Sequence, residues 1–201
     1  ARELEPLFPR QIIEHELNAK SRTFKIPKEV REAYQQWRPT PMFRAATLER
    51  ELDTPARLYY KVEGGSPSGS YESNTAIPQA FFTKQTGAEG IVTGGAGGVW
   101  ISAIGHAAAL FGLKGRVYSV RKPGTDHAWG DAFGRVWGVD VHASPSESTR
   151  VGKLQHDRQG PDSGSIATAL AEAYEEATRD PEVKFAIPTL MGHTLIHQTI
   201  V

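Results

Sequence analysis

A hydroxyl-rich loop at residues 64–75 carries the side chains best suited to chemistry. It reads Gly-Gly-Ser-Pro-Ser-Gly-Ser-Tyr-Glu-Ser-Asn-Thr and places a carboxylate, Glu72, beside a phenol, Tyr71. The loop joins a predicted strand to a predicted helix, so backbone N–H groups and the positive end of a helix dipole favour an anionic ligand there. We expect Ser70 and Asn74 to contact such a ligand. Glu72 and Tyr71 are the candidate acid–base groups.

A glycine-rich run forms a second candidate ligand loop. It consists of Thr93, Gly94, Gly95, Ala96, Gly97 and Gly98. The run follows a predicted strand, and open α/β sheets bind ligands at the carboxyl ends of their strands. Because small residues let a ligand approach the backbone closely, we expect this run to bind a substrate carboxylate, with a tight turn as the alternative. It matches neither G-x-G-x-x-G nor a P-loop, which argues against dinucleotides and ATP.

Metal and nucleophile chemistry find little support. His193 and His197 stand four residues apart on a predicted terminal helix, but no Glu-x-x pattern lies between them, so we interpret both as core or interface residues and predict no metal site. The chain has no cysteine, which excludes disulfides, thiol nucleophiles and cysteine-ligated zinc. No G-x-S-x-G elbow favours serine hydrolysis.

Composition narrows the class of protein. The 201 residues contain 23 basic and 23 acidic side chains and carry zero formal net charge, so neither nucleic acid nor an anionic membrane is an expected partner. The N-terminus lacks the apolar stretch of a signal peptide, and the small-apolar run at 107–113 is far shorter than the about 20 residues that span a bilayer. We expect a cytoplasmic protein of one or two domains.

The elements that position the two loops alternate between strand and helix. Helices are predicted at 9–17, 28–37, 43–52, 75–86 with Asn74 as N-cap, 100–111 ended by Gly112, 126–137, 165–179 with Ser163 or Ser165 as N-cap, and 189–201. Strands are predicted at 56–62, 91–93, 117–120 and 139–142, and residues 150–164 form a loop around a short helix. This order predicts an α/β fold with an open, mainly parallel twisted sheet and helices on both faces.

Three parts follow from this organisation. Residues 1–55 form an N-terminal helical segment, and residues 56–114 form a pocket-forming α/β part that contains both loops. Residues 115–201 form a further α/β part that ends in a terminal helix.

Nine segments together resemble the tryptophan synthase β chain, most closely its second, β-like branch. They are residues 37–41, 59–64, 66–70, 74–76, 108–113, 117–121, 144–146, 164–166 and 193–199. The resemblance extends over essentially the whole chain. It implies the fold type II architecture of pyridoxal phosphate (PLP) enzymes with an incomplete second domain, in which residues 115–190 resemble the mobile communication region.

The resemblance fails at the residues that the family uses for chemistry. The family binds PLP through a lysine in a Gly-Ser-His-Lys-x-Asn setting, where this chain has Glu72 in place of the lysine and Tyr71 in place of the histidine. A carboxylate cannot form an imine. The family's acid–base glutamate corresponds to Gly94, or to Thr93 after a one-residue shift. Its phosphate-binding loop belongs to a later part of the family's chain, so we expect no cofactor here.

Two functions remain open. The first is an accessory or partner-dependent subunit of an oligomeric biosynthetic assembly, bound to a second copy or to a polypeptide that covers the missing C-terminal half. The second is a PLP-independent lyase, isomerase or cyclase that uses Glu72 as acid or base on a small carboxylate-bearing substrate. Glu72 also has a plain structural explanation, as a solvated loop carboxylate or a helix N-terminal charge worth about 0.3–1 kcal/mol.

Overall fold

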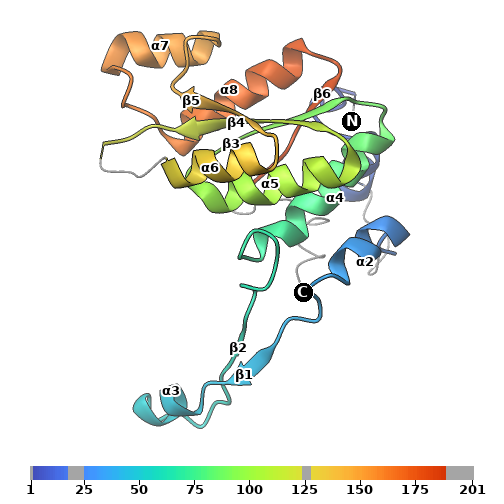
Figure 1. The fold of residues 1–201 in the computed structure, drawn as a ribbon, viewed down its shortest axis with the longest axis vertical. Coiled ribbons are helices and arrows are strands. Elements are labelled where there is room, and N and C mark those ends of the chain that lie inside the picture. Colours follow the sequence, from blue (N-terminus) through green and yellow to red (C-terminus); the bar gives the residue numbers. More distant parts are fainter. Residues whose placement is uncertain (1, 18–24, 124–127, 189–201) are drawn as a thin grey trace.

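A four-stranded parallel sheet is the centre of the molecule. The computed structural model describes residues 2–17, 25–123 and 128–188 (Figure 1). The strands lie in the order β5 (Asp140–Ser144), β4 (Lys114–Val120), β3 (Gly90–Gly95) and β6 (Val183–Phe185). All three neighbouring pairs are parallel, which confirms the predicted open parallel sheet.

Helices cover both faces of this sheet, as predicted (Figure 1). One face carries α4 (Glu72–Gln85), α5 (Gly98–Phe111) and α6 (Ala128–Val136). The other carries α8 (Ile166–Arg179), on which α7 (Arg150–Gln159) packs.

Two apolar clusters form the core, one on each face of the sheet. Ile91 and Val117 belong to the cluster of α4 and α5. Val92 and Tyr118 belong to the cluster of α8. The period of two along each strand therefore decides which helix layer a side chain meets.

The N-terminal part is less compact. Helices α1 (Arg10–Leu17) and α2 (Lys28–Tyr34) precede an antiparallel pair, β1 (Met42–Arg44) and β2 (Tyr59–Lys61). Helix α3 (Ala46–Glu51) lies between these two strands. We call residues 42–62 the arm, since Figure 1 shows them reaching away from the sheet and its helices.

Several predicted elements need correction. The predicted helix over 43–52 is wrong at its start, because Phe43 and Arg44 pair with the second strand of the arm. Asn74 is not an N-cap, because α4 already begins at Glu72 and Asn74 is buried in its first turn. Strand β6 was not predicted.

Other predictions hold or stay open. Ser165 caps α8 by accepting a bond from the Thr168 N–H, and Gly112 ends α5 in the left-handed region at φ 63°.

The predicted part boundary at 114/115 falls within β4, inside one continuous sheet. The predicted helix 189–201, with its two histidines, lies outside the described residues. No helix in the described ranges is long and apolar enough to cross a membrane.

Helix α8 approaches β3 at backbone distance. A Cβ on Gly94 would overlap the backbone of Ala169 and the amide of Leu170. Gly94 is buried and Ala169 is 0 % exposed at this crossing. Only glycine therefore permits this separation between helix and strand.

A buried carboxylate holds α8 to the segment after β5. Glu172 is 0 % exposed and accepts hydrogen bonds from the Ser144 hydroxyl, from the Ser146 N–H and hydroxyl at 2.9 and 2.6 Å, and from the Thr149 hydroxyl at 2.8 Å. These donors satisfy a group that would otherwise be costly to bury.

One histidine is buried in the α5 layer. The His106 ring packs edge-on against Trp37 and Trp137, with ring centroids 6.4 and 5.0 Å away. Its Nδ1 atom has no hydrogen-bond partner among the described residues. Burial holds the pKa of His106 below its ordinary value.

Replacing Gly94 by alanine is expected to destabilise the fold, because the added methyl group pushes α8 off β3. The free energy of unfolding in urea should fall by about 1–3 kcal/mol, the range of overpacked cores. Gly65→Ala is the matched control, since nothing lies within 4 Å of its Cβ position. Equal stability of the two variants would contradict the backbone contact.

His106 is expected to make stability depend on pH. Its pKa is lower in the folded than in the unfolded chain, so below about pH 6.5 the unfolded chain binds more protons and the free energy of unfolding falls with the pH. The difference between wild type and His106→Leu, measured by urea unfolding from pH 7.5 to 5, isolates this effect from the other histidines. Parallel curves would refute it.

Candidate functional site

The serines before α4 bond to one another. The Ser70 N–H donates to the Ser66 hydroxyl at 3.0 Å, and the Ser73 hydroxyl donates to that of Ser68 at 2.8 Å. The Ser70 hydroxyl accepts from the Glu72 N–H at 3.1 Å. Ser70, a predicted ligand contact, therefore also satisfies one of the free N–H groups of the first turn of α4.

Asn74 is hydrogen-bonded at its backbone carbonyl and at both polar atoms of its side chain. The Tyr34 hydroxyl donates to its carbonyl at 2.6 Å, and the Trp37 indole N–H donates to its side-chain oxygen at 3.3 Å. Its amide nitrogen reaches the Glu63 carboxylate at 3.5 Å. Since Asn74 is 1 % exposed, it ties α2 and the base of the arm to α4, and a ligand role for it stays a prediction.

Glu72 and Tyr71 lie together at the start of α4, as predicted. Glu72 is half-buried in the first helical turn, and Tyr71 is 39 % exposed directly before it. A carboxylate in the first turn of a helix is stabilised by the helix dipole. Residues 64–75 contain no lysine, so this loop offers PLP no amine for an imine and does not fit the covalent attachment that the family resemblance implies.

The glycine run packs against its surroundings at most of its positions. Gly94 and Gly95 belong to strand β3 itself. A Cβ would meet the Trp100 indole at Gly95 and would overlap the Trp129 ring at Gly98. Close packing therefore explains three of the four glycines without a ligand.

Only the tip of the run is open. Ala96 is exposed, and Gly97 has a φ of 82° with nothing within 4 Å of its Cβ position. Both residues lie directly before the N-terminus of α5, which has no side-chain cap. A small carboxylate bound here would meet backbone N–H groups rather than side chains.

The hydroxyl of Thr93 is hydrogen-bonded within the core of the fold. Its hydroxyl donates to the Ala186 carbonyl at 2.7 Å and accepts from the Trp100 indole N–H at 3.1 Å. The residue is 0 % exposed. Its expected contact with substrate stays a prediction, while its observed bonds join β3 to α5 and to the segment after β6.

Topology brings both candidate loops to the same side of the sheet. Helix α4 leads into the amino end of β3, and α5 leaves from the carboxyl end of β3. Both helices therefore run opposite to the strands, and they pack side by side (Figure 1). Their N-termini, with the serine loop and the glycine run, lie toward the carboxyl ends of the strands.

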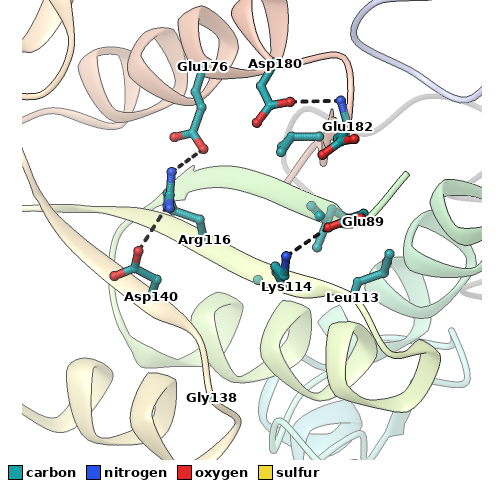
Figure 2. A pocket seen from close by; sticks show the side chains of 13 residues that line it. Glu89, Leu113, Lys114, Arg116, Gly138, Asp140, Glu176, Asp180 and Glu182 are labelled. Atoms are coloured by element: carbon teal, nitrogen blue, oxygen red, sulfur yellow. Dashed lines mark hydrogen bonds and ion pairs between the residues drawn. The ribbon is translucent and has the colours of Figure 1, made fainter. Parts of the chain in front are cut away.

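A cavity of about 560 Å³ opens at the opposite, amino edge of the sheet (Figure 2). This cavity was not predicted. Its charged residues are Glu89, Lys114, Arg116, Asp140, Glu176, Asp180 and Glu182. The alternation of Lys114 and Arg116 with buried Gly115 and Val117 along β4 is the signal that could have revealed a charged face.

The bases of this cavity are already paired with acids. Lys114 bonds to Glu89 at 2.9 Å, and this bond holds the pKa of Glu89 below its ordinary value. Arg116 bridges Asp140 at 3.2 Å and Glu176 at 2.7 Å (Figure 2). These ion pairs join neighbouring elements across the edge of the sheet and assign no ligand. Within the described ranges, no three acidic or histidine residues could together hold a metal ion.

One tyrosine borders the same ion pairs. The Tyr118 hydroxyl donates to Glu176 at 2.7 Å. Burial and this hydrogen bond raise the pKa of Tyr118 above its ordinary value. The phenol therefore remains protonated and acts as a hydrogen-bond donor.

Comparison with known proteins gives consistent relatives. No protein-family model matches the chain. The tryptophan synthase beta chain 2 of Pyrococcus furiosus is 38% identical over 201 residues, which are 100% of this chain and 45% of that protein. The tryptophan synthase beta chain of Pyrococcus horikoshii is 41% identical over 198 residues, 97% of this chain and 42% of that protein. The chain spans about half the length of the relatives it matches.

A solved structure agrees on the fold. The structure of maize serine racemase superposes with a TM-score of 0.56 at 17% identity, covering 86% of this chain and 47% of that one. At this identity the likeness concerns the fold alone. Over its whole length, the chain belongs to the tryptophan synthase β-like proteins of PLP fold type II and corresponds to their N-terminal half.

Proposed function

We propose that this chain is a tryptophan synthase β-like subunit without PLP chemistry of its own, which works in an oligomeric assembly with another polypeptide. The observation that carries the proposal is Glu72 at the position where the family resemblance requires the imine-forming lysine. A carboxylate has no nucleophilic amine, and its charge repels the phosphate and phenolate of the cofactor.

The packing around Gly94 supports the same proposal. Without the one-residue shift, Gly94 takes the position of the family's acid–base glutamate. Its side-chain direction is filled by the backbone of Ala169 and Leu170. A glutamate at 94 would therefore require α8 to move away from β3.

The chain is expected to form no covalent link with PLP, because the serine loop contains no amine. The test is equimolar PLP followed by borohydride reduction and peptide mass spectrometry, with the Pyrococcus furiosus relative as positive control. A stoichiometric pyridoxyl group on one lysine of this chain would overturn the proposal. Weak labelling scattered over exposed lysines, and equally strong in chain unfolded by urea at the same pH, would agree with it.

A second candidate is a PLP-independent lyase, isomerase or cyclase that acts on a small carboxylate-bearing substrate. It is favoured by the half-buried Glu72 beside the exposed Tyr71 at the N-terminus of α4. In this function Glu72 serves as general acid or base, a role typically worth about 10²–10⁴-fold in rate.

Replacing Glu72 by glutamine separates a structural from a catalytic role. If Glu72 only complements the dipole of α4, Glu72→Gln lowers the free energy of unfolding by about 0.3–1 kcal/mol, and salt reduces the loss. A carboxylate retained for catalysis gives unchanged or higher stability, since active sites cost stability. The control is Glu147→Gln, at an exposed loop glutamate, which should change stability by no more than about 0.5 kcal/mol.

A further inference from the structure

A second cavity lies on the face of the sheet that α8 covers. Its volume is about 560 Å³, which falls within the roughly 300–1,000 Å³ of small-molecule sites. Its wall takes no residue from the serine loop or the glycine run. Its apolar lining comes from the start of α7, from α8, and from β6 with the segment that follows it: Val151, Leu170, Tyr174, Phe185, Ile187 and Pro188.

Two aromatic side chains form part of this wall. Phe185 and its neighbour Leu170 are 9 and 8 % exposed and belong to the core cluster of α8. Tyr174 is 46 % exposed, and its ring lies edge-on to that of Phe185 with the centroids 6.0 Å apart. A ring that enters the cavity can therefore contact an exposed aromatic side chain above an apolar floor, which favours a flat aromatic ligand.

Hydrogen bonds hold the cavity wall in place. The Ile187 N–H donates to the Gln79 side-chain oxygen at 2.7 Å, and the Gln79 amide donates to the Ile187 carbonyl at 2.8 Å. These two bonds fix the segment after β6 to α4, while Glu172 fixes α8 to the segment before α7. A preformed cavity loses little conformational freedom when a ligand binds.

Two polar side chains of the wall are already used by the helices. The Glu175 carboxylate accepts the N–H groups of Arg150 and Val151, each at 3.0 Å, and pairs with Arg179. The Thr178 hydroxyl donates to the Glu175 carbonyl at 2.8 Å. Neither side chain therefore needs a ligand to satisfy it.

Arg150 differs from these two residues. Its side chain is exposed at the rim of the cavity and forms no ion pair within the part of the chain that the structure describes. The charge of the nearby Glu175 is compensated by Arg179. One positive charge is thus available beside an apolar floor, and a guanidinium matches the two oxygens of a carboxylate.

We propose that this cavity binds a small aromatic monocarboxylate, with the ring against Tyr174 and Phe185 and the carboxylate on Arg150. The ring loses contact with water on the apolar floor, and the guanidinium sets the orientation of the ligand. A second carboxylate would find no base of its own and would lie close to Glu175. This inference is independent of the proposed function and concerns a site apart from both candidate loops.

The test is titration of the full chain with phenylacetate, followed by heteronuclear NMR of the backbone amides. Saturable shifts are expected at 150–151, 170–178 and 185–188. Arg150→Gln should weaken the affinity about tenfold or more, since it removes a charge-assisted hydrogen bond. Ala171→Phe, which places a ring in the cavity, should weaken it similarly. Arg158→Gln is the matched control, because Arg158 is exposed on the same helix and does not line the cavity.

Two further probes test the class of ligand. Phenethylamine has the same ring with an ammonium group, and acetate has the carboxylate without a ring, so each should bind about tenfold more weakly or worse. Equal binding of phenylacetate and phenethylamine would overturn the role of Arg150. Shifts confined to 70–75 and 93–98, a titration that does not saturate, or equal losses in Arg150→Gln and Arg158→Gln would overturn the site. Circular dichroism of each variant confirms that the chain stays folded.

Discussion

The close backbone contact between α8 and strand β3 sets the distance between the sheet and the helix layer on that face. Gly94 lets Ala169 and Leu170 approach the strand so closely that no side chain fits between them. Side chains on the same face of the strands, such as Val92 and Tyr118, then fill the layer under α8. Because the backbone of α8 occupies the direction in which a side chain at 94 would point, only glycine fits at this position.

The two candidate loops differ in which of their residues are exposed and which are hydrogen-bonded to the rest of the fold. In the serine loop, Ser70 and Asn74 are bonded to their neighbours, while Glu72 and Tyr71 lie at the more accessible end of α4. In the glycine run, only Ala96 and Gly97 remain open. The open tip of the glycine run thus presents backbone N–H groups rather than side chains.

Much of the fold was predictable from the sequence, because the local helix and strand patterns match the elements that pack around the core. Alternating strands and helices predicted the parallel sheet with two helix layers, and Ser165 and Gly112 predicted helix ends. The errors arise where contacts with residues distant in the sequence determine the local structure. Asn74 looked like an N-cap but is bound by Tyr34 and Trp37. Strand β6 has only three residues and is fixed by its neighbour β3.

The candidate site was harder to predict, because glycine serves two purposes that a sequence cannot separate. A cluster of glycines favoured a ligand loop, whereas Gly95 and Gly98 leave room for Trp100 and Trp129. Trp100 follows the run directly in α5, but Trp129 comes from α6, which local patterns do not connect to the run. The charged cavity at the other edge was missed for a related reason, since Arg116, Asp140 and Glu176 meet only in the folded chain.

The four donors gathered by Glu172 have a mechanical consequence. If helix α8 slid along the sheet, the hydrogen bonds that Ser144, Ser146 and Thr149 donate to Glu172 would break. Glu172 is 0 % exposed, so water could not replace these donors. These hydrogen bonds therefore fix the position of α8 relative to the segment after β5. The same helix makes the close backbone contact at Gly94, so both contacts restrict where α8 can lie on the sheet.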